Sequence, residues 1–374
     1  MASKNSRKKR VKSGVLKLNN AVVKSVLGIV AASSFALAFG EEKITQFIPF
    51  AGSSGNATCL NQFYREEPPF LVKESLNKKT YPLCFNGFNV MYSGVSKTPL
   101  WTAEYLSVAR LSQKIKREDN FHEETRVDSN DRATLSDYKG SGYDRGHMSP
   151  NADMPTKDAQ FDSFSLANMI PQAPKNNQQV WRELEEAVRA IVTKQKQDVY
   201  VVTGPMFTGQ KLKTIGKGVI VPTAVFKAVY LPSKGIIGAY VAPNDNSLQV
   251  KVVSVCQLEE EIGMNIFPQL TSEQKRNTYK LPLNVTQVKA NQSIAYSHWD
   301  GESQCAEDVA SDQIQALQKQ FTNSGKYLES TSTDQSSIEN MPNAQVDADE
   351  QIKQDVIKKV TSSIWQYILQ LLKQ

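Results

Sequence analysis

Short runs of β-branched and aromatic residues, separated by Gly, Pro and Ser turn signals, recur through the middle of the chain. They predict strands at residues 88–92, 100–106, 198–205, 218–222, 224–231, 235–242 and 249–256. Several strands in succession, with few helical stretches between them, are typical of antiparallel sheets. The pattern therefore predicts an α+β fold with a mainly antiparallel central sheet flanked by helices.

A different period marks the helices. Five apolar residues form one stripe at 100° per residue, which predicts a helix over residues 181–191. They are Val180, Leu184, Ala187, Val188 and Ile191. A second helix is predicted to start within residues 259–264. Ile314, Leu317 and Phe321 are also at helical spacing.

The same patterns divide the chain into segments. Residues 57–310 are predicted to form one globular domain, long enough to bury a sizeable core. The other predicted segments are a flexible lead-in at 41–56, a helical extension at 311–325, a polar linker at 326–350 and an amphipathic helix at 351–374. That last helix either packs on its own domain, mediates self-association or sits on a membrane.

Charge changes the interpretation of the N-terminus. The 374-residue chain has a formal net charge of +6, but residues 1–40 hold eight basic residues and no acidic one. The rest of the chain has 36 basic against 38 acidic residues. The basic stretch precedes an apolar run at 26–39 and the small residues Ala38 and Gly40, which is the layout of a cleaved signal peptide at 1–40. We therefore predict a secreted or periplasmic protein. An uncleaved signal-anchor in the membrane is the alternative.

The four cysteines all follow the predicted signal. An even count in an exported chain, with no C-x-x-C spacing, favours two disulfide bonds over metal ligation. Three connectivities are possible. We predict the sequence-local one, Cys59–Cys84 and Cys256–Cys305.

Candidate chemistry gathers between residues 141 and 189. His147 is one of three histidines in the chain and follows Asp144 and Arg145 in a Gly-rich turn. Phosphodiester hydrolysis needs a base for water, positive charge at the transition state and help for the leaving oxygen. A neutral imidazole can be that base. The alternative is a turn histidine that is hydrogen-bonded to the backbone.

Polar residues on the predicted helix strengthen the first interpretation. Asn177, Trp181, Glu185 and Arg189 follow one another at intervals of four. Glu185 therefore borders the apolar stripe and Arg189 lies one step further round, where side chains reach toward a neighbouring cleft. The alternatives are an N-cap role for Asn177 and an i,i+4 ion pair between Glu185 and Arg189.

Four separated motifs occur in order across this region. They are Asp144-Arg-Gly-His147, Asn168-Met-Ile-Pro-Gln172, Asn177-Gln-Gln-Val-Trp181-x-x-x-Glu185 and Val202-Thr-Gly-Pro205. Together they closely resemble the DNA/RNA non-specific endonucleases, which are ββα-metal (His-Me finger) enzymes. The resemblance covers residues 81–308 and says nothing about the chain's two ends. It implies a ββα-metal motif at the active site.

The resemblance also implies roles for the matching residues. His147 would be the general base that activates water. Asn177 would be the one direct protein ligand of a single Mg²⁺, with Mn²⁺ as the alternative metal and waters as the other ligands. Glu185 would hold a metal-bound water able to protonate the leaving 3′ oxygen. No small-molecule cofactor is implied.

The remaining matches concern the phosphate and the geometry of the site. Arg145 and Asn168 would support both, and Asp144 would lie just outside the ligands of the hydrated metal. Arg117 looks like the family's transition-state arginine, and Arg189 matches a further arginine that contacts substrate.

These patterns predict an exported, Mg²⁺-dependent endonuclease that cuts DNA and RNA to 5′-phosphate products with little sequence preference. One alternative is an exported nucleic-acid-binding or DNA-uptake module on the same fold with little turnover. Another is an assembly protein whose working part is the C-terminal helix, which would also be the route to self-association. Intact His147, Asn177 and Glu185 favour the enzyme.

Overall fold

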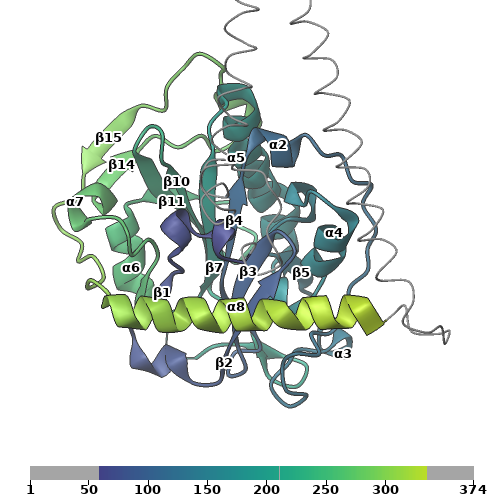
Figure 1. Ribbon diagram of the computed structural model, residues 1–374. Helices are drawn as coiled ribbons and strands as arrows, with labels where there is room; N and C mark the ends of the chain where they lie inside the picture. Colours follow the sequence, from purple (N-terminus) through teal and green to yellow (C-terminus); the bar gives the residue numbers. More distant parts are fainter. Residues whose placement is uncertain (1–58, 210, 335–374) are drawn as a thin grey trace, which may run out of the picture. The chain divides into compact units, whose positions relative to one another are not determined.

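A seven-stranded sheet forms the centre of the domain (Figure 1). The computed structural model describes residues 59–209 and 211–334. The strand order is β12-β11-β10-β7-β4-β3-β2, and every neighbouring pair is antiparallel. The strands are β2 (Thr80–Phe85), β3 (Phe88–Ser93), β4 (Thr98–Leu106), β7 (Val199–Met206), β10 (Ala224–Leu231), β11 (Ile236–Pro243) and β12 (Lys251–Val253). The predicted α+β fold with a mainly antiparallel sheet is confirmed.

Short strand pairs and helices surround this sheet. The pairs are β1 (Phe70–Leu71) with β13 (Met264–Asn265), β5 (Asp144–His147) with β6 (Met169–Gln172), β8 (Thr214–Ile215) with β9 (Val219–Ile220), and β14 (Asn277–Tyr279) with β15 (Tyr296–Trp299). The α-helices are α2 (Val108–Leu111), α3 (Leu135–Tyr138), α4 (Lys157–Ser163), α5 (Arg182–Gln195), α6 (Val255–Ile262), α7 (Ser272–Lys275) and α8 (Ser311–Asp334).

The two faces of the sheet bury different partners. One face packs against α6 and α8, where Phe321 of α8 lies 5.6 Å from Trp101 of β4 between ring centroids. The other face packs against α5, whose Leu184 and Val188 join Val201 of the sheet in a second apolar cluster. Successive strand residues point to opposite faces, so nearly every position of the central strands is buried. The candidate site lies on the α5 face.

Two predicted elements begin in different places. The strand predicted at 249–256 is only Lys251–Val253, and α6 starts at Val255, before the helix start predicted at 259. The reason is the N-cap of α6, where the Ser254 side chain accepts a hydrogen bond from the Gln257 amide at 2.9 Å. The strand predicted at 218–222 shrinks to Val219–Ile220.

Helix α8 extends the predicted helical extension. It continues to Asp334, nine residues past the predicted end at 325 and into the predicted polar linker. Once a helix is nucleated on a packed face, each further residue adds a backbone hydrogen bond, so polar sequence does not stop it at once. The predicted signal peptide (1–40), lead-in (41–56) and C-terminal amphipathic helix (351–374) lie outside the described residues. Of the helices in the described ranges, none has the length and apolar character needed to cross a membrane.

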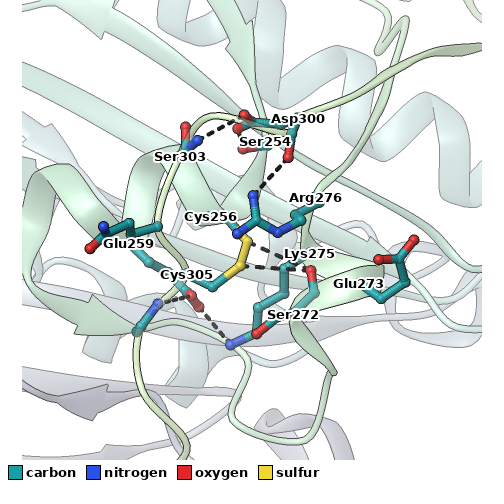
Figure 2. The surroundings of a disulfide bond; sticks show 12 residues. Ser254, Cys256, Glu259, Ser272, Glu273, Lys275, Arg276, Asp300, Ser303 and Cys305 are labelled. Atoms are coloured by element: carbon teal, nitrogen blue, oxygen red, sulfur yellow. Dashed lines mark hydrogen bonds and ion pairs between the residues drawn. A yellow bond between two sulfur atoms is a disulfide. The ribbon is translucent and has the colours of Figure 1, made fainter.

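Both predicted disulfides are present. Cys59–Cys84 joins the start of the domain to β2, and Cys256–Cys305 joins α6 to the segment after β15. Figure 2 shows Glu259 and Lys275 beside the second bond. The sequence-local connectivity is confirmed.

Candidate active site

A β-hairpin followed by a helix forms the centre of the candidate site. β5 pairs antiparallel with β6, with Asp144 opposite Gln172 and His147 opposite Met169. A Cβ atom on Gly146 would lie 1.9 Å from the Gln172 side-chain oxygen, so only glycine fits this position of β5. The chain then enters a helical segment that leads into α5. The predicted ββα arrangement is confirmed.

The first part of that helical segment is a π-helical turn, residues Asn176–Trp181. The chain is already helical from Pro174, so Asn177 lies inside the first turns and is not an N-cap. Its Nδ2 instead donates to Asp144 Oδ2 at 2.9 Å, and Gln178 Nε2 donates to the same oxygen at 2.9 Å. The N-cap interpretation is therefore wrong. Such π-helical turns are frequent at functional sites.

Asn176, Gln172 and Asn244 fix the position of this turn against the sheet. Asn176 Nδ2 donates to the Pro243 carbonyl at the end of β11 at 2.9 Å and its Oδ1 accepts from Gln172 Nε2 at 2.5 Å. Asn244 accepts from the Ala173 amide at 2.8 Å, just before the helix. Buried amides of this kind lock the turn in one orientation.

A cavity of about 500 Å³ opens beside the turn. Its lining residues are Arg117, Phe121, Leu135, Tyr138, Lys139, Tyr143, Asp144, Arg145 and Asn177. The structure thus brings four predicted site residues to one cavity: Arg117, Asp144, Arg145 and Asn177. Three cations and one carboxylate line it, which suits a phosphate-bearing ligand.

His147 lies at the end of β5 between aromatic rings. Its ring centroid is 4.9 Å from that of Phe164 and 5.9 Å from that of Phe121. Burial, the Arg117 guanidinium and Arg145 lower the pKa of His147 to about 3, against the smaller opposing effect of Asp119. The imidazole is therefore neutral in the ordinary pH range. Its buried Nε2 has no hydrogen-bond partner among the described residues, so no backbone bond occupies this nitrogen.

Asn168 is buried behind the hairpin and does not line the cavity. Its Nδ2 donates to the carbonyls of Ser149 and Ser163 at 2.8 and 2.9 Å, and its Oδ1 accepts from the Ser149 amide at 2.9 Å. These bonds hold the backbone directly after His147. Asn168 therefore shapes the site and does not face a ligand there.

The two predicted phosphate arginines differ in their support. Arg145 stacks on Phe121, with its guanidinium carbon 3.9 Å from the ring centroid. Arg117 lies on the irregular loop before Phe121, is about half exposed and pairs with Asp119 at 2.5 Å. Arg145 is thus held by an aromatic face, whereas Arg117 is on the solvent side of the cavity.

Arg189 pairs with a buried carboxylate. Its guanidinium lies 2.9 Å from Asp153, and it does not line the cavity. Asp153 is buried and needs a cation close by, which accounts for this placement. The predicted contact of Arg189 with substrate stays a prediction. The alternative interpretation, an i,i+4 ion pair between Glu185 and Arg189, is wrong, since Arg189 pairs with Asp153 and the described residues form no such pair.

Glu185 lies half-buried on α5, toward the sheet. Burial raises its pKa to about 7, although Lys227 and Arg189 lower it in part. It has no hydrogen-bond partner among the described residues, and it does not line the cavity. Glu185 therefore changes charge near neutral pH.

Sequence analysis missed two groups of residues near the site. Tyr138, Lys139 and Tyr143 form a wall of the cavity, and their only signal was their position just before Asp144. Lys227 lies in β10 below α5 and is fully buried. A lysine inside the apolar run 224–231 was the available signal.

The oxygens at the π turn fit a divalent metal. The amide nitrogen of Asn177 donates to Asp144, so its Oδ1 is left without a donor among the described residues. The Asp144 carboxylate lines the same cavity. Hard oxygen donors of this kind suit Mg²⁺, which keeps most of its waters. Within residues 59–209 and 211–334, no cluster of three or more His, Cys, Asp or Glu could hold a metal instead. A sparsely liganded, hydrated ion matches this donor set.

Comparisons with known proteins agree with this geometry. Residues 69–273 match the sequence model of a family described as DNA/RNA non-specific endonuclease. The mitochondrial nuclease EXOG of Danio rerio is 36% identical over 205 residues, which cover 49% of this chain and 60% of that protein. Human mitochondrial endonuclease G is 34% identical over 214 residues, covering 52% of this chain and 69% of that protein.

A solved structure shares the fold. It is the crystal structure of the EndoG/EndoGI complex, with a TM-score of 0.52 and 23% sequence identity. The match covers 60% of this chain and 96% of that chain. Helix α8 lies beyond the segment that matches the family.

Proposed function

This chain belongs to the DNA/RNA non-specific endonuclease family, and we propose that it is an exported, Mg²⁺-dependent endonuclease that cuts DNA and RNA. One observation carries the proposal. In the ββα unit, a neutral His147 lies at the end of β5, and oxygens of Asp144 and Asn177 lie on β5 and on the π turn that follows the hairpin. The cavity beside them is lined by Arg117, Lys139 and Arg145.

The base in this proposal is His147. Its pKa of about 3 keeps the imidazole neutral, so it can accept a proton from water at any ordinary pH. The aromatic rings of Phe121 and Phe164 hold the imidazole in place on two sides. Asn168 supports the same position by bonding the backbone that follows.

The metal in this proposal is Mg²⁺, held by Asn177 Oδ1 with Asp144 beside it. A bound divalent ion would supply charge neutralisation for the scissile phosphate and stabilise the leaving oxygen. Glu185, in its ionised form, would accept a hydrogen bond from a water near that oxygen. Its pKa of about 7 makes this form half-populated at pH 7 and dominant at alkaline pH.

The substrate in this proposal is the sugar-phosphate backbone. Arg145 lies on the hairpin and stacks on Phe121. Arg117 and Lys139 add positive charge to the lining of the cavity. Such groups recognise phosphate oxygens, which are the same in every sequence. Hence the proposed enzyme cuts DNA and RNA with little sequence preference and leaves 5′-phosphate ends.

The proposal is tested by digesting plasmid DNA and total RNA with the purified protein, with Mg²⁺ and with excess chelator. We expect degradation of both nucleic acids with Mg²⁺ and none with chelator. Digestion that persists in chelator would reject the metal. Binding without cleavage under Mg²⁺ and Mn²⁺ would instead support a nucleic-acid-binding module.

Export is proposed from the N-terminal pattern alone. Expression of the full chain in a bacterial host, followed by fractionation and N-terminal sequencing, tests it. We expect a mature protein that starts after Gly40, outside the cytoplasm. A full-length, cell-associated product would favour the signal-anchor.

A further inference from the structure

A polar row crosses the sheet beneath α5. Thr102 of β4 pairs with Thr203 of β7, which pairs with Lys227 of β10. Directly paired residues on neighbouring strands share a face. Val225 and Val229, two positions either side of Lys227, belong to the apolar cluster that packs against α5. The row therefore lies on the α5 face, in the middle of an otherwise apolar layer.

Lys227 is the charged member of this row and is 1% exposed. Its ammonium donates to Thr203 Oγ1 at 2.8 Å. It also lies 5.3 Å from the ring centroid of Trp181, the last residue of the π turn. No carboxylate is within ion-pair distance of it among the described residues. A buried ammonium without direct pairing is costly, so nearby charge must compensate it.

Two carboxyls on neighbouring elements are affected by this charge. Lys227 acts on Glu185 of α5 and on Glu104 of β4, and in both cases it opposes burial, which raises their pKa values to about 7 and about 8. The other charged groups that act on these two carboxyls are Arg110, Asp153, Arg189 and Glu186. Of the cations near Glu185, Lys227 lowers the pKa of this carboxyl most, and it lies on β10 and not on α5.

Polar groups on the same face of the sheet and on Trp181 are incompletely bonded. Glu104 Oε1, Thr102 Oγ1 and Trp181 Nε1 are buried and have no hydrogen-bond partner among the described residues, while the other oxygen of Glu104 pairs with Arg110 at 3.2 Å. The contacts of Lys227 with Thr203 and the Trp181 ring do not cancel its charge, so that charge acts on the neighbouring groups.

We propose that Lys227 is a positioning residue for the nuclease reaction, seating the π turn through Trp181 and holding Glu185 as a carboxylate through its charge. The inference rests on the proposed function. The ammonium touches neither substrate nor Asn177. It acts one layer below them, from the central sheet.

The test compares Lys227→Met with Lys275→Met in the full-length protein. Lys275 is the matched control because it is also a fully buried lysine, at 2% exposed, and lies outside the candidate site. For both variants and the wild type, kcat and KM on plasmid DNA are measured from pH 5.5 to 9.5 with Mg²⁺. Urea midpoints are measured in parallel.

Loss of Lys227 raises the pKa of Glu185, so the rising limb of the kcat–pH profile should move to higher pH. We expect a move of about one pH unit or more, because a nearby opposite charge shifts a carboxyl by roughly one to three units. At pH 7 kcat should fall about fivefold or more, recovering by pH 9, with KM within about twofold. Lys227→Arg, which keeps the charge, should return the limb toward its wild-type position.

Lys275→Met should lower the urea midpoint and leave the limb in place. If Lys227→Met does not fold, Thr203→Val, which removes the anchor of the ammonium, should give a smaller shift in the same direction. An unshifted limb in folded Lys227→Met, or in Thr203→Val when it alone folds, overturns the inference. If the wild type shows no Mg²⁺-dependent cleavage, the proposed function fails, which is a separate result.

Discussion

The molecule buries two lysines in two different ways. Lys275, beside the Cys256–Cys305 disulfide, pairs with Glu259 at 2.9 Å (Figure 2). It also donates to Asn265 Oδ1 at 2.7 Å. Glu259 in turn accepts from the amides of Ile266 and Ala306. Lys227, beneath α5, has one hydrogen bond and no contacting carboxylate among the described residues.

The difference separates structure from chemistry. Around Lys275 each charge has direct partners, and the result is a fixed junction between α6, α7 and the segment that follows β15. Around Lys227 and His147, some buried polar atoms have no partner within the part of the chain that the structure describes. Unpaired buried groups reduce stability and are often found where a ligand or a reaction uses them.

The largest effect is expected at His147. His147→Ala should lower kcat by roughly 10²- to 10⁴-fold, because the general base is lost. It should also lower the urea midpoint at pH 7, since truncation leaves the space between Phe121 and Phe164 unfilled, but the variant should remain folded. Single-turnover cleavage and urea unfolding check the two halves of this prediction.

The pH dependence of stability gives His147 a second test. Its folded pKa of about 3 lies below the unfolded value, so the unfolded chain binds the proton first as pH falls. Wild-type stability should therefore drop from about pH 6.5 downward, and His147→Ala should drop less. Equal acid sensitivity of the two proteins would contradict the burial of a neutral imidazole.

The second effect concerns the closed network. Lys275→Met should lower the free energy of unfolding by roughly 3–5 kcal/mol, because it leaves Glu259 buried without its cation. kcat measured well below the unfolding midpoint should not change. A large loss of kcat in the folded variant would show that the two networks are not separate.

The smallest expected effect is a change in the free energy of unfolding that has opposite signs for two Glu→Gln variants. Glu185→Gln should raise the free energy of unfolding at pH 8 by about 1 kcal/mol, because the folded state resists ionising this carboxyl. Glu259→Gln should lower it, because the Lys275 pair is broken. Denaturant unfolding of both variants at pH 8 measures these changes. Two changes of the same sign would contradict the difference drawn between the surroundings of Lys227 and Lys275.

The sequence was sufficient for the central strands of the sheet, because they are buried on both faces, but the edge strand β2 (Thr80–Phe85) was not predicted. The apolar runs of β7, β10 and β11 have few polar interruptions, and the observed bounds differ from the predicted ones by at most one residue. Both disulfides were also predictable from sequence order. These features depend on local composition, which a sequence displays directly.

The rest depended on partners far away in the chain. The π turn follows from bonds between Asn176, Gln172 and Pro243, so the spacing of side chains at intervals of four did not reveal it. The ion pair of Arg189 was not predicted, because its partner Asp153 lies 36 residues away. The register of β10 against β7 determines that the Lys227 side chain lies on the face of the sheet that α5 covers. The sequence motifs located the site, but contacts between distant segments determined which residues lie behind it.

Mn²⁺ binding tests the central assignment most directly, because it requires no turnover. Electron paramagnetic resonance titration of Mn²⁺ should show one bound ion per chain for the wild type and for Lys275→Met. Asn177→Ala should lose that binding, since it removes the amide oxygen assigned to the ion while the closed network around Lys275 stays intact. Wild-type affinity in a folded Asn177→Ala variant would contradict the assignment of the metal to this turn.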